Sequence, residues 1–441
     1  MTRQHLSYIL LLIIYPYLLL HTPTVQAAET DGPDTTIPEK ITDFQTCAVT
    51  GVKRIPQLQR SKIEIDIRHL DEDDSRWSYV PTLSLSSYYY FSEDEATISF
   101  NAANYRPWEP YYTLQARKLI THIVMLKHVQ ATAQALYKLA DTFLQLFVTD
   151  QNESHYKQIV DLSQKRLHYA KQRYESGLTT DLEIEFEEQR NAFIAAEYEG
   201  NAIKRDALLN GLCISMNLPD PTVFDLDAPQ VLKQILGNSP LSTPQSSPQP
   251  KDSIEQQIMQ IKGILQQKNI TLAYSKFLPD FSIGFRSPDV LNVSVNDDQE
   301  YFLYAGMSLT LWDGNKRSRD ITRQKMVLRQ MDFEKKEIEN NDSLEWLKAT
   351  QQYSSAKSAY ALSQSIEKLN NIQMKKREID YARGTIELPE LIDHQIALHR
   401  KSLDTIQKQF SLNKATLKLR HLSGQLLKDT FNISLADIPY E

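Results

Sequence analysis

The chain has 441 residues, with 49 lysine and arginine residues, 56 aspartate and glutamate residues and a formal net charge of -7. This mildly acidic balance gives no electrostatic reason to expect nucleic acid as a partner. A chain of this length ordinarily forms two or three globular domains. Its 12 glycines and long proline-free stretches indicate instead that much of it is continuous helix.

The N-terminus, residues 1–27, has the three parts of a secretory signal peptide. Arg3 supplies a basic start, residues 6–20 form an apolar run, and "VQAA" supplies small residues for cleavage. The apolar run is shorter than the ~20 residues that a spanning helix needs, so a membrane anchor is the weaker alternative. We therefore expect an exported protein, and no later segment is apolar enough to span a membrane as a helix.

Residues 28–75 form a polar, acidic segment that ends in "HLDEDDSR", and we expect part of it to be flexible. A β-hairpin is predicted next, over residues 79–105. In "YVPTLSLSSYYYF" and "EDEATISFNAANY", apolar residues alternate with polar ones. That pattern is typical of strands with one apolar face.

A helical hairpin is predicted over residues 110–217. Between residues 111 and 174 the chain has neither proline nor glycine, and its apolar residues recur at helical spacing. About 65 residues at ~1.5 Å each give a rod on the order of 100 Å long. Gly177 interrupts this pattern, and Thr180 and Glu183 have the spacing of a capping box that starts the returning helix.

The same order of elements then occurs a second time. After a proline- and serine-rich linker at 218–252, a second β-hairpin is predicted over 277–313 and a second helical hairpin over 318–427. "FLPDFSIGF" lies 198 residues after "YVPTLSLSS", and the turn "YARGTIELPE" lies 207 residues after "YESGLTTDLE". The chain therefore contains two repeats, at 76–217 and 253–428, followed by a tail at 429–441.

Neither repeat can bury its apolar surface alone, because an isolated two-stranded ribbon is marginally stable in water. Several copies could pool their hairpins into one closed barrel and their helices into a ring. Strands of about ten residues with one apolar face have the length of outer-membrane strands. Aromatic residues that would suit the two membrane interfaces flank them, although a β-sandwich would also use such residues: Tyr88, Tyr89, Trp108 and Trp312.

These features resemble the outer membrane efflux protein family, the TolC-like exit ducts, over roughly residues 76–430. The order strand, strand, helix, turn, helix carries the resemblance, together with "FLPDFSIGF", "MSLTLWDGNKRSRD" and the two turn sequences. It is stronger in the second repeat than in the first, where "NYRPWEP" replaces the usual glycine after the second strand.

The resemblance implies an α+β fold of mostly long α-helices, in which a homotrimer builds an outer-membrane β-barrel continued by a periplasmic α-helical barrel. The turns at Gly177 and Gly384 would face a periplasmic adaptor protein and an inner-membrane transporter. Outer-membrane lipid would surround the strands. Proteins of this kind conduct cargo and do not catalyse, so no cofactor and no resident metal are expected. Drugs, metal ions and polypeptides all stay open as cargo.

The resemblance also implies a gate at the second turn. Glu390 and Asp393 match the family's ring of pore-constricting carboxylates, Tyr381 matches a gate tyrosine, and Glu183 matches an acid of the first turn. Alternatively, acids in a first helical turn simply complement the helix dipole. Where the family has an arginine that locks the closed state, this chain has Ile386. Arg383 could substitute for it, or the lock could differ or be missing.

A second group of charges lies where the last strand enters the helix: Lys316, Arg317, Arg319 and Arg323. Cations at a helix N-terminus are unfavourable with its dipole. They indicate either phospholipid headgroups as a partner or simply a solvated basic face.

Catalysis finds little support, because the sequence lacks HExxH, GxSxG and phosphate-binding glycine motifs. The main alternative to a duct is a periplasmic coiled-coil adaptor or scaffold without channel activity. Two helical hairpins, each after its own strand pair, favour the duct. Cys47 and Cys213 could form a disulfide in an exported protein, but Cys213 has the surroundings of a buried small apolar residue.

Overall fold

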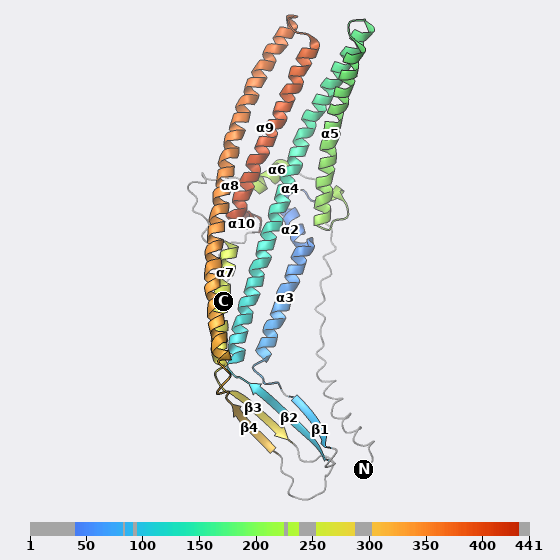
Figure 1. The fold of residues 1–441 in the computed structure, drawn as a ribbon. Coiled ribbons are helices and arrows are strands. Elements are labelled where there is room, and N and C mark those ends of the chain that lie inside the picture. The colour runs from blue at the N-terminus through green and yellow to red at the C-terminus, as the bar shows by residue number, and fades with distance from the viewer. Residues whose placement is uncertain are drawn as a thin grey trace, which may run out of the picture.

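The computed structural model describes residues 40–82, 84–90, 95–224, 228–237, 253–286 and 302–431. The chain is a long bundle of helices with a four-stranded sheet at one end and two helical turns at the other (Figure 1). The predicted signal peptide, most of the linker after residue 237 and the last ten residues lie outside the described residues.

Two helical hairpins of equal dimensions run along the molecule, as predicted. Helices α4 (Glu109–Glu175) and α8 (Lys316–Ala382) each have 67 residues. The returning helices α5 (Asp181–Ser215) and α9 (Leu388–Leu422) each have 35. Both pairs begin 207 residues apart, so the structure confirms the duplication. None of the helices in the described part of the chain combines the length and the apolar character needed to cross a membrane.

Each repeat also contains a helix before its strands. Helices α3 (Pro56–Trp77) and α7 (Ile254–Ser275) both have 22 residues, begin 198 residues apart, and pack along α4 and α8 respectively. The short helix α2 (Phe44–Arg54) precedes α3. Most of the polar segment at 28–75 is therefore helical, whereas residues 28–39 lie outside the described residues, and the expectation that part of the segment is flexible stays a prediction. A repeat that starts at residue 76 leaves out α3, whose "DEDD" run conceals its helical period.

The four strands form one antiparallel sheet in the order β1-β2-β3-β4. They are β1 (Ser84–Tyr90), β2 (Glu95–Tyr105), β3 (Asp280–Arg286) and β4 (Phe302–Ser308), so β4 ends before the predicted residue 313. Strand β2 of the first repeat pairs with β3 of the second, with Phe100 opposite Phe285. This pairing joins the two predicted hairpins into one sheet.

The main apolar core lies near the middle of α4, where short elements wrap around the long helices (Figure 1). Helices α2, α6 (Ala228–Leu236) and α10 (Gln425–Phe431) pack there, next to a single 3-10 turn, η1 (Pro221–Val223). Phe44 and Phe143 meet edge to face with ring centroids 5.9 Å apart. Cys47 and Cys213 are both buried in this core and both free, so no disulfide joins them.

Candidate functional site

The two hairpin turns have the same backbone geometry. Gly177 and Gly384 have φ angles of +70° and +71°, in the left-handed region that favours glycine. In each turn a backbone N–H closes a six-residue loop onto the helix, from Leu178 to Arg173 O at 2.9 Å and from Thr385 to Asp380 O at 2.9 Å. This is the Schellman arrangement that ends many helices. The glycines are therefore structural necessities of the turns.

Asp393 is the centre of an ion-pair cluster that joins the two hairpins. Its carboxylate contacts Arg166 of α4 and Arg190 of α5, with Arg190 Nη2 2.6 Å from Oδ1. Arg166 also contacts Glu187 of α5, Nε to Oε1 at 2.8 Å, and both side chains are largely buried. Nearer the turns, Arg173 Nη1 lies 2.8 Å from Glu387 Oε2. These contacts connect α9 to α4 and α5.

The protonation state of Asp393 follows from this cluster. Burial raises the pKa of its carboxyl, but the hydrogen bonds and charges of Arg166 and Arg190 together outweigh burial, so the pKa lies below its ordinary value. A carboxylate with a lowered pKa stabilises the folded state at neutral pH. That contribution is lost only as the pH falls through the lowered value. The cluster is therefore intact across the neutral and mildly acidic range.

The other predicted gate residues lie elsewhere. Glu390 is half exposed and faces α8, with Oε1 3.7 Å from both Arg377 Nη1 and His394 Nε2. Tyr381 is exposed at the end of α8. Glu390 and Asp393 thus share α9 but contact different helices.

The predicted capping box at the first turn is not formed. Thr180 is the N-cap of α5, but its side chain makes no capping hydrogen bond in the described structure. The Glu183 carboxylate accepts a hydrogen bond from the Thr179 hydroxyl instead.

The structure brings together residues that the sequence did not single out. Arg166 and Arg190 lie in the first repeat and their partner Asp393 in the second, so no spacing along the chain indicates the contact. Arg383, considered as a substitute for a locking arginine, makes no ion pair within the described residues. Ile386 is half-buried beside it.

The long helices lie side by side in the order α5, α4, α9, α8 (Figure 1). The two edge helices carry apolar side chains that the single chain leaves exposed. On α5 these include Leu182, Phe186, Phe193 and Ile203. On α8 they follow a 3.5-residue period in each half of the helix: Met326, Phe333, Leu344, Leu347, Leu362, Leu369, Ile372 and Ile379.

The sheet has one apolar face. Its register aligns Leu85, Phe100, Phe285 and Leu303 in one row across the four strands, while Ser84 and its partner Asn101 belong to the opposite face. In the single chain Leu303 is 79% exposed. The alternation predicted from the sequence is therefore confirmed.

The four predicted interface aromatics divide between the two ends of the sheet. Tyr88 and Tyr89 lie near the end of β1 that is farther from the helices, and Tyr88 is exposed. Trp108 and Trp312 lie at the helical end. Trp108 is half-buried against Phe281, with ring centroids 6.0 Å apart, whereas Trp312 is 76% exposed.

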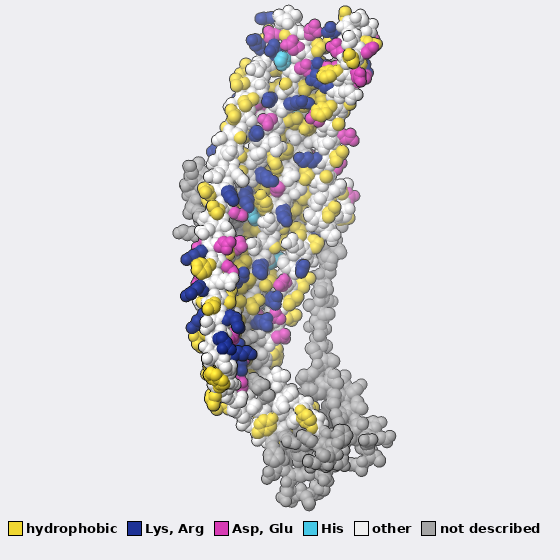
Figure 2. All heavy atoms as spheres, viewed as in Figure 1, with side chains coloured by type: hydrophobic (Ala, Val, Ile, Leu, Met, Phe, Trp, Pro, Cys, Tyr) yellow, Lys and Arg dark blue, Asp and Glu magenta, His cyan; other side chains and the backbone are white. Residues whose placement is uncertain are grey.

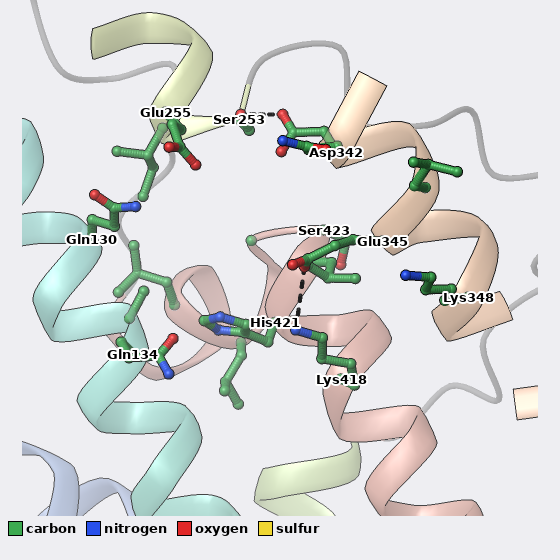
Figure 3. A pocket seen from close by; sticks show the side chains of 18 residues that line it. Gln130, Gln134, Ser253, Glu255, Asp342, Glu345, Lys348, Lys418, His421 and Ser423 are labelled. Atoms are coloured by element: carbon green, nitrogen blue, oxygen red, sulfur yellow. Dashed lines mark hydrogen bonds and ion pairs between the residues drawn. The ribbon is translucent and has the colours of Figure 1, made fainter. Parts of the chain in front are cut away.

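A polar cavity of about 680 Å³ lies between α4, α7, α8 and α9 (Figure 3). Asp342 accepts hydrogen bonds from Ser253 Oγ and Gln256 Nε2, both at 2.7 Å. Lys418 Nζ lies 3.4 Å from Glu345 Oε2. These pairs connect α8 to α7 and to α9. Within the described residues no group of three or more histidine, cysteine or acidic side chains is arranged to hold a metal ion.

Solved structures similar to this chain include outer-membrane channels. The Campylobacter jejuni CmeC outer membrane channel matches with a TM-score of 0.68 and 11% identity, over 89% of this chain and 90% of that one. The open-state Neisseria gonorrhoeae MtrE channel matches with a TM-score of 0.66 and 13% identity, over 88% and 89%. The Vibrio cholerae outer membrane protein VceC matches with a TM-score of 0.59 and 11% identity, over 85% and 95%.

No protein-family profile and no curated protein sequence matches the chain. At these identities the matches establish the fold. The chain has the fold of outer-membrane channels, and this confirms the resemblance to the TolC-like exit ducts at the level of the fold.

Proposed function

We propose that this chain is one subunit of an outer-membrane exit duct. The duct passively conducts substrates that an inner-membrane pump delivers through a periplasmic adaptor, in a tripartite efflux or type I secretion system. The strands lie in the outer membrane and the helices extend into the periplasm. The likeness to solved efflux channels over most of both chains supports this assignment.

The proposal rests on edges that a single chain leaves without a partner, both in the sheet and in the layer of long helices. Strands β1 and β4 are the two edges of the sheet, and helices α5 and α8 are the two edges of the helical layer. An exposed strand edge readily pairs with another chain. If subunits contact one another head to tail around a ring, β1 of one subunit pairs with β4 of the next. The same contact places α5 of one subunit against α8 of its neighbour.

The exposed apolar side chains fit this ring. Those on α5 and α8 would be covered by the neighbouring subunit, and the apolar face of the sheet would face lipid. A homotrimer, as the resemblance implies, would supply twelve strands from the four of each chain. The turns at Gly177 and Gly384, at the far end from the strands, would meet the adaptor. The contacts of Asp393 would hold that end closed.

The proposal is tested by current through the purified protein in a planar lipid bilayer. We compare wild type with a double variant, Leu362→Glu and Leu369→Glu, which places two charges on the exposed apolar face of α8. Gln364→Glu with Asn371→Glu is the control, because it adds the same charge on another exposed face of α8.

We expect discrete conductance steps and a single oligomeric species from wild type and the control. The Leu362 and Leu369 variant should be monomeric and silent, since buried charges would oppose assembly. A folded wild-type protein that gives no current would contradict the duct and favour the adaptor or scaffold alternative.

A further inference from the structure

We infer that the junction between β4 and α8 binds the headgroup of an anionic phospholipid in the periplasmic leaflet of the membrane. The binding surface is defined here as the basic junction: Lys316, Arg319 and Arg323, with Leu311 and Trp312 beside them. The inference rests on the proposed function, because it needs the strands to lie in a bilayer.

The basic junction carries positive charge that nearby acids do not neutralise. Lys276 Nζ is 2.9 Å from Asp320, and Arg317 Nε is 2.9 Å from Asp313. Within the described residues Lys316 and Arg319 have no ion pair. Arg323 has a long ion pair with Asp320, at 3.6 Å, and 72% of its side chain is exposed. Figure 2 shows Lys and Arg side chains gathered where the helices approach the strands.

Two backbone N–H groups at the start of α8 already donate hydrogen bonds to a side chain of the protein. Asp313 accepts hydrogen bonds from the N–H groups of Lys316 at 3.1 Å and Arg317 at 3.0 Å. An anion would therefore bind the side chains of the basic junction, and the helix end is not its ligand. This leaves long, flexible cations that can extend toward a phosphate.

Apolar and aromatic groups lie directly beside these cations. Leu311 is 88% exposed, and Trp312 is also exposed. Met307 and Leu309 extend this surface along the chain toward the sheet. Tryptophan next to lysine and arginine at the end of an apolar band is typical of a membrane interface. A soluble anion would use the cations alone, whereas a phospholipid uses both surfaces.

The first repeat shows that the fold does not need these cations. The positions 207 residues earlier are Glu109, Tyr112 and Ala116, at the equivalent start of α4. The equivalent of Trp312 is Tyr105, whose hydroxyl donates to Tyr79 O at 2.7 Å. The basic junction is therefore an addition to the second repeat. On a chain with a formal net charge of -7, it attracts anions locally.

The test measures binding of short-chain phosphatidylglycerol and phosphatidylcholine to the detergent-purified protein by native mass spectrometry. Lys316→Gln, Arg319→Gln and Arg323→Gln are combined in one variant. The control combines Arg329→Gln, Lys335→Gln and Lys336→Gln, which remove three charges further along α8. Glutamine keeps the helix propensity of these positions, and circular dichroism checks the helix content of each protein.

We expect wild type and the control to prefer phosphatidylglycerol. The basic junction variant should lose that preference, with affinity reduced roughly 10- to 100-fold for three surface charges. Equal binding of the two lipids by wild type, or an unchanged preference in the variant, would overturn the inference. So would competition by inorganic phosphate at concentrations equal to those of the lipid, because it would indicate a simple anion site.

The same three proteins are tested for current in neutral phosphatidylcholine bilayers. Current from all three with no lipid preference would overturn the lipid site and leave the duct standing. No current from any of them would count against the duct itself, whatever the lipid preference.

Discussion

Helices α4 and α8 have the same length and the same place in their repeats, yet their surroundings differ. Helix α4 packs against α3, α5, α7 and α9, whereas α8 packs against α7 and α9. In the described part of the chain α8 buries four residues, Ile321, Ala349, Ser363 and Met374, while α4 buries a row along most of its length. Each helix thus keeps the equivalent neighbours of its own repeat, and α4 also contacts α7 and α9 of the second repeat. The second copy keeps an apolar surface exposed in the single chain, and the proposed ring of subunits would cover it.

A matched pair of isoleucines tests this comparison with the largest expected effect. Ile159 of α4 and Ile366 of α8 are 207 residues apart, with 1% and 39% of their surfaces exposed in the single chain. Ile159→Ala removes a side chain from the cluster with Ile194, Ile392 and Ile396. It should cost about 2–5 kcal/mol of unfolding free energy. Thermal unfolding followed by circular dichroism measures the change.

Ile366→Ala is the control for Ile159→Ala. It should cost the detergent-dissociated monomer less than about 1 kcal/mol, since the side chain is already half exposed there. In the assembled form its cost should increase. Equal losses in the dissociated monomer would mean that the two helices have similar surroundings, contrary to the comparison.

The residues that follow the two turns also differ between the repeats, and an effect of intermediate size is expected from changing them. Asp393 has Phe186 as its equivalent in the first repeat, whereas Glu390 has Glu183. Asp393→Asn removes the charge that holds Arg166 and Arg190 together. We expect a severalfold larger conductance in planar bilayers, because the hairpins of the two repeats then separate more easily.

Glu390→Gln and Glu183→Gln serve as comparisons for Asp393→Asn. Among the described residues, the ion-pair partners of Glu390 are Arg377 and His394, both at 3.7 Å. Loss of its charge should therefore reduce cation preference with little change in conductance. Glu183→Gln should change neither. If Glu390→Gln opened the channel as widely as Asp393→Asn, the contacts between the hairpins would not be the lock.

Local pattern predicted most of the elements, because a helix or strand depends on residues a few positions apart. The hairpin turns and the duplication could be read in this way. The helix α3 was missed because its acidic surface breaks the apolar period. Contacts between repeats were also missed. His155 and His399, whose Nδ1 atoms are 3.3 Å apart, lie 244 residues apart in the sequence.

At the candidate site, too, local pattern does not predict the contacts between residues that are far apart in the sequence. The turn glycines have a local signature, and the carboxylates near them were found by resemblance. Which arginines each carboxylate meets depends on the direction that its side of α9 faces. That direction is set by packing against α4, α5 and α8, and one-residue offsets along a helix change it by about 100°. Only the assembled helices place Asp393, and not Glu390, between two arginines.

The effect predicted to be smallest at neutral pH concerns His421, near the end of α9. Burial and Lys418 lower its pKa to about 4, against the opposing charge of Glu345, and its ring lies 4.8 Å from that of Tyr137. The histidine is therefore neutral in the folded state at pH values where the unfolded chain already binds a proton. Stability should fall as the pH decreases from about 6.5 to about 4.

His421→Phe should remove that part of the pH dependence while keeping a ring against Tyr137. The equivalent position in the first repeat is Ile214, which is 80% exposed. Ile214→His places the same side chain in solvent, where its pKa should differ little between folded and unfolded states. Thermal unfolding at several pH values should therefore show a flatter profile only for His421→Phe. If Ile214→His steepened the profile as much as His421 does, burial at the end of α9 would not be the cause.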